Sequence, residues 1–125
     1  MAQAVQGQGG EVTQAALDKA RAMPLRAPLV VVVVARLQEH FKVPKSEQLI
    51  TAGCAAHAIE LAAFAQGIGA VWRTGELSYN AHVAKGLGLE DGEEVVAFLY
   101  LGTPQNDLRD APKVNSAEFV KAWSA

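Results

Sequence analysis

Cysteine is almost absent from this sequence, and that scarcity limits its covalent chemistry. Cys54 is the only cysteine among the 125 residues, so no disulfide can form within the chain. Paired-cysteine zinc spacings are excluded for the same reason. A lone thiol in an apolar stretch is typical of a reducing compartment. We therefore expect a cytoplasmic protein in which Cys54 is a small buried hydrophobic residue.

Aromatic residues and charge of one sign are also scarce. Aromatics make up 6% of the sequence, charged residues 19%, and the formal net charge is −2. This balance provides no basic surface for nucleic acid or for an anionic membrane, so we expect neither as a partner. Half of the residues are apolar, which indicates one globular domain over 1–125. Residues 1–10, rich in Gly and Gln, predict a flexible leader.

No charge-free apolar run is long enough to be a targeting or membrane segment. The run from Ala27 to Ala35 contains Pro28 and ends at Arg36, whereas a span needs roughly 20 apolar residues. Five consecutive valines within this run favour a strand. An unbroken apolar strand indicates that both faces of its sheet are covered.

The chain from Ser46 to Gln66 predicts one long helix. Ser46 is the expected N-cap, and Gly67 is expected to take the left-handed position after the helix. Because this helix is apolar nearly all round, we expect it to be central and packed on several sides. A chain of this size has few elements to cover it, so part of its surface is expected to be a subunit interface.

Shorter elements surround this helix and predict a layered α/β or α+β domain. The Gly67–Gly69 and Gly86–Gly88 pairs follow helices, so we interpret them as helix ends and not as a dinucleotide fingerprint. The tail from Ala117 to Trp123 fits a helix or a strand equally well. The remaining predictions are a helix over Val12–Met23, a strand over Ile68–Trp72, a helix over Tyr79–Lys85 capped by Ser78, and a strand over Val95–Leu101.

Cys54, His57 and Glu60 share one face of the long helix. A metal site or a Cys–His nucleophile would need further groups from elsewhere, and the sequence offers few. We expect no metal site here. Instead, His57 and Glu60 are expected to bond a neighbouring element or a partner chain.

The block Trp72-Arg73-Thr74-Gly75 is the other candidate site. The Arg73 fork suits a phosphate or carboxylate, and the N–H groups of Thr74 and Gly75 suit the same pocket. Alternatively, Trp72 packs in the core, Arg73 is a solvated charge and Thr74-Gly75 is a turn. The residues alone favour this second interpretation.

Three blocks, in order, resemble the short bacterial FMN-dependent nitroreductases. The first runs from Ala20 to Pro28 and leads into the valine strand. The second runs from Val43 through Ala52-Gly53-Cys54-Ala55-Ala56 to Gly75, and the third is Ala97-Phe98-Leu99-Tyr100-Leu101-Gly102-Thr103-Pro104. Each block alone is weak, but the three in sequence are fairly specific to the family.

This resemblance implies an α+β layered sandwich with a long central helix and a small, mainly antiparallel sheet, dimeric through that helix. It implies FMN between the subunits, contacted by Trp72, Arg73, Thr74 and Gly75. It also implies NAD(P)H as co-substrate, with nicotinamide binding assigned to Ala62, Ala63, Phe64, Ala65, Gln66 and Gly67. The reaction implied is hydride transfer through flavin N5 to a small nitroaromatic or quinone acceptor, with no catalytic side chain.

The chain departs from this family at its start. An Arg-Arg-Ser motif that grips the FMN phosphate is missing, as if the first third of the family domain were absent. FMN affinity is then expected to fall, or another phosphate site is expected, with Arg26, Arg109 and Lys113 as the spare cations. The alternative function is a non-catalytic dimerising remnant of the same fold that holds flavin weakly or not at all.

Overall fold

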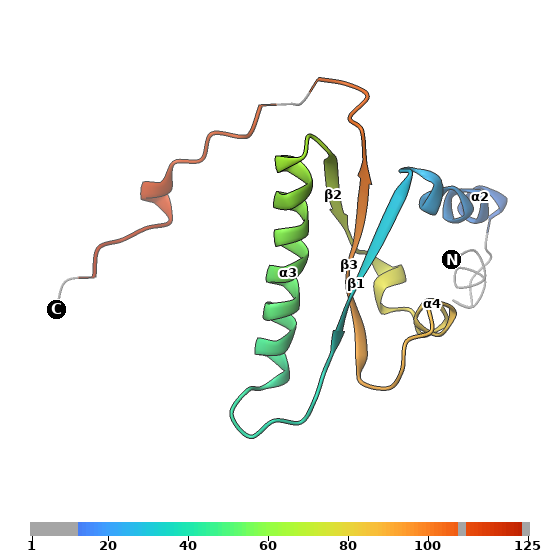
Figure 1. The fold of residues 1–125 in the computed structure, drawn as a ribbon, viewed down its shortest axis with the longest axis horizontal. Coiled ribbons are helices and arrows are strands. Elements are labelled where there is room, and N and C mark those ends of the chain that lie inside the picture. The colour runs from blue at the N-terminus through green and yellow to red at the C-terminus, as the bar shows by residue number, and fades with distance from the viewer. Residues whose placement is uncertain (1–12, 108–109, 124–125) are drawn as a thin grey trace.

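The computed structural model describes residues 13–107 and 110–123 (Figure 1). Short 3-10 turns, namely Met23–Leu25, Glu76–Tyr79 and Ser116–Glu118, connect or follow its regular elements. The helices and strands are α2 (Gln14–Ala22), β1 (Leu29–Arg36), α3 (Lys45–Ala65), β2 (Gly69–Arg73), α4 (Ala81–Gly86) and β3 (Glu93–Gly102).

The three strands form one antiparallel sheet in the order β1-β3-β2. Leu29 pairs with Leu101 on one side of β3, and Val71 pairs with Tyr100 on the other. The register with β1 shifts between Val33 and Val34, as at a β-bulge. The predicted strands and the small antiparallel sheet are therefore confirmed, and β3 is the central strand.

Both faces of the sheet are covered, as the valine run predicts. On one face, Phe98 and Tyr100 of β3 cluster with Val83 of α4. On the other face, Ala97 and Leu99 pack against Ala56 of α3. Alternate residues of a strand point to opposite faces, so β3 supplies both cores and forms the middle of three layers (Figure 1).

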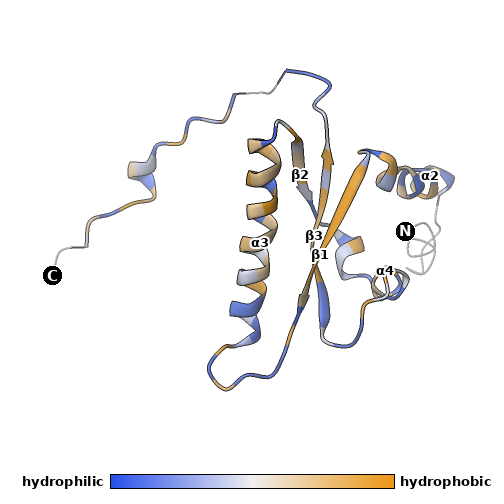
Figure 2. Cartoon of the chain, in the orientation of Figure 1, coloured by the Kyte–Doolittle hydropathy of each residue, from blue (hydrophilic) through white to orange (hydrophobic). Residues whose placement is uncertain are grey.

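The long helix is confirmed, and the described chain covers only one of its sides, which leaves the rest of its apolar surface exposed. Along α3 only Ala56 and Ala63 are buried, whereas Ile50 is 65%, Leu61 57% and Phe64 70% exposed. The helix lies along one face of the sheet, and its other side carries apolar colour with nothing over it (Figure 2). A three-stranded sheet covers one side of a helix, and no other described element is available for the rest.

Within the described residues, α3 alone has the length and composition of a membrane span. Its mean hydropathy reaches 1.3 over 18 residues, of which 11% are buried. The core helix of a globular protein passes the same test. Alanine at the positions against the sheet gives α3 the small residues that close packing needs, as Ala56 and Ala63 show.

Two predicted caps are wrong. The helix α3 begins at Lys45 after Pro44, whose carbonyl accepts from the N–H groups of Glu47 and Gln48, so Ser46 lies inside the first turn. Ser78 lies in a 3-10 turn and does not cap a helix.

Asn80 caps α4 instead of Ser78. Its side-chain oxygen accepts from the N–H groups of His82 and Val83. Asparagine at this position satisfies two amide groups of the first turn, which a serine two residues earlier cannot reach.

The predicted helix ends are confirmed. Gly67 has φ +73°, its N–H donates to Phe64 O, and the Ile68 N–H donates to Ala63 O. Gly88 has φ +79° after α4. This hydrogen-bond pattern after α3 is the Schellman motif, which requires a left-handed residue and so favours glycine.

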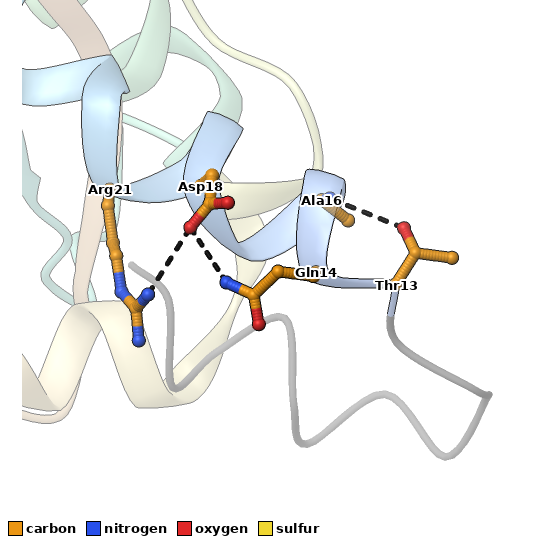
Figure 3. A network of polar contacts seen from close by, with 5 residues as sticks. All are labelled: Thr13, Gln14, Ala16, Asp18 and Arg21. Carbon is orange, nitrogen blue, oxygen red and sulfur yellow. Dashed lines mark hydrogen bonds and ion pairs between the residues drawn. The ribbon is translucent and has the colours of Figure 1, made fainter.

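The first described helix, α2, is held at its start by side chains (Figure 3). Thr13 Oγ1 accepts from the Ala16 N–H, and Asp18 accepts from Gln14 and Arg21. The helix is shorter than predicted, and the expected leader over residues 1–10 lies outside the described residues. Its C-terminal end runs directly into the Met23–Leu25 turn.

The C-terminal tail fits neither predicted form. Among the described residues that follow the short turn Ser116–Glu118 there is no regular structure, and Phe119 and Trp123 are exposed. The described tail extends away from the sheet (Figure 1), so neither apolar side chain has a surface of its own chain to pack on.

Candidate functional site

Two adjoining pockets lie beside β2 and the start of β1. The larger has a volume of about 850 Å³ and is walled by the ends of α3 and β3. The smaller, of about 320 Å³, is lined by Met23, Arg26, Val71, Arg73, Thr74 and Tyr100. Small-molecule sites span roughly 300–1,000 Å³, so both volumes lie within that range, the smaller near its lower end.

Glycines let the chain close this end of the sheet. A Cβ on Gly69 would lie 3.1 Å from the Gly102 carbonyl oxygen, and one on Gly102 would lie 2.7 Å from Pro28 Cδ. Side chains at these positions would push β1, β2 and the end of β3 apart. The larger pocket is therefore bordered by closely packed backbone.

The predicted block Trp72–Gly75 divides between the two faces of the sheet. Arg73 and Thr74 line the smaller pocket. Trp72 points the other way, packs in the α3-side core, and lies 3.7 Å from a Cβ built on Gly53. Gly75 has φ +97° and turns the chain just after the pocket. Strand alternation explains this division, because adjacent residues of β2 face opposite sides.

The predicted segment Ala62–Gly67 is only partly at the pockets. Phe64 and Gly67 line the larger pocket, whereas Ala63 is buried. Ala62, Ala65 and Gln66 line neither pocket. The Gln66 amide donates to the Ala62 carbonyl instead, at 3.0 Å.

Three residues line both pockets and were not predicted as site residues, namely Arg26, Val71 and Tyr100. From the sequence alone, Arg26 was named only as one of three spare cations for another phosphate site. Of the other two, Lys113 is exposed and lines neither pocket, and Arg109 lies outside the described residues. The pairing of Val71 with Tyr100 is a long-range property, so no local pattern could have identified Tyr100.

The smaller pocket is cationic. Arg26 and Arg73 both line it, and neither forms an ion pair with any residue that the structure describes. Glu60 lines the larger pocket alone, with its carboxylate 3.8 Å from His57 Nδ1. The two pockets therefore differ in charge, and Arg26 belongs to both.

Free backbone donors follow Arg73. Neither the Thr74 nor the Gly75 N–H donates to another backbone group of the described chain. A turn that leaves successive N–H groups free is suited to holding an anion or a polar ring edge. The residues alone favoured a plain turn here, yet Thr74 lines the smaller pocket and Gly75 directly follows it.

The group on the α3 surface is not arranged as expected. Cys54 is exposed, which corrects the expectation that it is buried. His57 and Glu60 pair with each other instead of with a neighbouring element. Among the described residues, no set of three or more His, Cys, Asp or Glu is placed to hold a metal ion.

The clearest shifts in pKa lie away from both pockets. The ammonium of Lys45 bonds the Glu39 carboxylate, which lowers the pKa of Glu39 and raises the pKa of Lys45. Both groups are exposed. This pair therefore belongs to the start of α3 and has no role in the candidate site.

Comparison with protein families matches the Nitroreductase family over residues 1–103. Among curated proteins, "Putative NAD(P)H nitroreductase YdjA" of Escherichia coli K12 is 50% identical over 90 residues, covering 72% of this chain and 49% of that protein. "Putative NAD(P)H nitroreductase" of Haemophilus influenzae is 34% identical over 106 residues, covering 83% of this chain and 58% of that protein. The chain thus spans about half the length of these relatives.

Among solved structures, the nitroreductase-like family protein of Bacillus cereus has a similar fold. The TM-score is 0.72 at 20% identity, covering 99% of this chain and 66% of that one. At this identity the likeness shows the fold alone, and it agrees with the expected α+β sandwich.

Proposed function

This chain belongs to the nitroreductase family, and on that premise we propose that it is an FMN-dependent oxidoreductase. The proposed reaction transfers a hydride from NAD(P)H, through the flavin, to a small nitroaromatic or quinone acceptor. The observation that carries the proposal is the convergence of Arg73 and Thr74 with the apolar wall of Val71 and Tyr100 on one pocket.

The residues present fit a flavin nucleotide. FMN combines an apolar ring, a polar ring edge and a dianionic phosphate, so its site needs an apolar wall, amide donors and cations. Val71 and Tyr100 provide the wall, the free N–H groups of Thr74 and Gly75 provide donors, and Arg73 provides a cation. The hydride chemistry itself would be supplied by the flavin when bound.

The chain's own part in such a reaction is binding and orientation. The Thr74 and Gly75 amides would stabilise negative charge at the edge of the ring, because they are fixed by the backbone turn at Gly75. Trp72 would not contact the ligand. Its side chain would instead hold β2 against the α3-side core. No side chain has to transfer a proton, so we assign no catalytic residue.

We assign the larger pocket to the nicotinamide co-substrate and the acceptor. Phe64 and Gly67 line it, in agreement with the segment that the resemblance associates with nicotinamide. Ala62, Ala63, Ala65 and Gln66 would then act by positioning the helix end. The co-substrate pocket and the flavin pocket would then share one wall, formed by Val71 and Tyr100.

The exposed side of α3 supports a homodimer. Ile50, Leu61 and Phe64 present large apolar side chains there, and contiguous exposed apolar surface marks interaction sites. A second copy is the occupant we propose, since an isologous contact covers both helices at once. The exposed thiol of Cys54, unoxidised in a reducing compartment, fits the cytoplasmic location that we propose.

The test is the visible absorption spectrum of the purified chain, before and after addition of FMN and removal of free flavin. A retained flavin band that NAD(P)H bleaches supports the proposal. Arg73→Ala is expected to weaken FMN binding roughly tenfold or more, because a charge-assisted hydrogen bond contributes about 1.5–3 kcal/mol. Arg36→Ala is the matched control, since Arg36 also ends a strand but lines neither pocket.

A protein that shows no flavin band after incubation with saturating FMN and removal of free flavin would overturn the enzyme proposal. The alternative, a dimerising domain of the same fold without catalysis, would then hold. Unchanged FMN affinity in Arg73→Ala would remove that side chain from the site while leaving the backbone donors in place.

A further inference from the structure

Two arginines from distant parts of the chain line one small pocket. Arg26 follows the Met23–Leu25 turn, and Arg73 ends β2. Both line the 320 Å³ pocket, and none of its six lining residues is acidic. Neither guanidinium has an ion-pair partner among the residues described.

The backbone around Arg26 is held in place on both sides. Pro24 lies in the first positions of the preceding 3-10 turn, and the Arg26 N–H donates to the Met23 carbonyl at 3.4 Å. Pro28 follows two residues later and touches the end of β3, where a Cβ on Gly102 would clash with it. Proline fixes its own φ and restricts the residue before it, so the backbone on either side of Arg26 has little freedom.

A third polar group stands between the two pockets. Tyr100 is 9% exposed and lines both of them. No side-chain hydrogen bond of the described residues involves its hydroxyl, and that oxygen is not fully buried. A nearly buried phenol without a partner is a donor that a ligand can use.

These observations point to a ligand with a compact, multiply charged end. Two like charges in one pocket repel each other unless an anion lies between them. A guanidinium binds phosphate through a planar fork of N–H groups, and two forks from different elements can hold one phosphate from two sides. The adjoining pocket of about 850 Å³ shares Arg26 and Tyr100, so a ligand in either pocket can contact these two residues.

We propose that Arg26 and Arg73, with the Tyr100 hydroxyl, form a binding subsite for a phosphate group. The subsite deepens the proposed function and rests on it only for the source of the phosphate, which is either FMN or the nicotinamide co-substrate.

The first experiment needs no flavin. Inorganic phosphate is titrated into the full chain, and the arginine side-chain Nε–Hε signals are followed by NMR. We expect saturable shifts of the Arg26 and Arg73 signals, with the Arg21 signal unmoved. Shifts of all arginines alike, or of none, would overturn the subsite whatever the chain does with flavin.

The second experiment identifies the source of the phosphate. FMN and riboflavin, which lacks the phosphate, are titrated against the chain and against Arg26→Ala. If FMN is the source, Arg26→Ala weakens FMN roughly tenfold to a hundredfold and leaves riboflavin unchanged. If the co-substrate is the source, both flavins bind as before and KM for NAD(P)H rises by a similar factor.

Matched variants separate recognition from charge and from folding. Arg26→Lys keeps the charge but loses the fork, so an intermediate loss is expected. Arg21→Ala removes the same charge from α2, outside both pockets, and should change nothing. Equal losses of FMN and riboflavin in Arg26→Ala, or no loss for either flavin or NAD(P)H, would overturn the proposal. Failure of the wild-type chain to bind any flavin, with the phosphate shifts present, would instead overturn the proposed function alone.

Discussion

The strand β3 and the helix α3 are both rich in apolar residues, and they have opposite surroundings. Five successive residues of β3, from Ala97 to Leu101, are buried. In α3, twice as long, only Ala56 and Ala63 are buried. The strand has two neighbours and two covered faces, whereas the helix has the sheet on one side. An apolar sequence therefore indicates a surface that has to be buried, but it does not show that the same chain buries it.

The largest expected effect tests this contrast with one chemical change. Leu99→Ala, at a position that is fully buried, should lower the free energy of unfolding by about 2–5 kcal/mol. Leu61→Ala, at a position 57% exposed, should lower it by less than about 1 kcal/mol. Urea denaturation at low protein concentration measures both. Equal losses would mean that α3 is covered within the chain.

The next effect concerns what covers α3. Ile50→Glu places a charge on the exposed apolar side, and a buried unpaired charge is costly. We expect the dimer dissociation constant to rise at least roughly tenfold, as measured by sedimentation velocity. Leu25→Glu, at an exposed apolar position in the turn after α2, is the control and should leave the constant unchanged. A wild-type chain that is monomeric at every concentration would remove the dimer.

A smaller effect compares one glycine from each element. Gly102→Ala in β3 puts a Cβ 2.7 Å from Pro28 Cδ, and such overpacking costs about 1–3 kcal/mol. Gly53→Ala in α3 meets only Trp72 at an ordinary 3.7 Å, and should stabilise the helix by about 0.5–1 kcal/mol. Thermal unfolding followed by circular dichroism gives both signs. The same sign for the two variants would contradict the packing described.

The smallest effect is a pH dependence at the start of α3. The pKa of Glu39 is lowered by Lys45, so its contribution to stability is present above the ordinary carboxyl pKa and lost as pH falls through the lowered value. The pKa of Lys45 is raised, so its contribution is present below the ordinary lysine pKa and lost as pH rises through the raised value. Glu39→Gln should remove both dependences. Since the pair is exposed, the change in urea midpoint should be slight.

The parts of the fold that depend on local chemistry were predictable from the sequence. The valine strand, the length of α3 and the left-handed glycines Gly67 and Gly88 follow from branching, periodicity and backbone freedom. The start of α3 was predicted two residues late, because Pro44 already has the extended backbone of a cap. Cys54 was predicted buried because an apolar sequence cannot show which side of a helix its own chain covers.

The candidate site was predictable only in part, for a different reason. Arg73 and Thr74 follow a recognisable strand end, so their residue types identified them. Arg26 and Tyr100 reach the same pocket through pairing between residues far apart in sequence, such as Leu29 with Leu101 and Val71 with Tyr100. Register of this kind is set by the whole sheet. Trp72 was assigned to the site through the family resemblance, and alternation in β2 turns its ring to the other face.

The order β1-β3-β2 also has a consequence for the timing of folding. The central strand is the last of the three in the chain, and β1 and β2 do not pair with each other. While the chain emerges from the ribosome, neither of the first two strands has a partner until β3 has been made. The valine-rich β1 therefore has no pairing strand while α3 and β2 are synthesised. Long-range pairing of this kind folds slowly, and an unpaired apolar strand is prone to aggregation in the interval, so β1 is the segment for which a nascent chain most needs a chaperone.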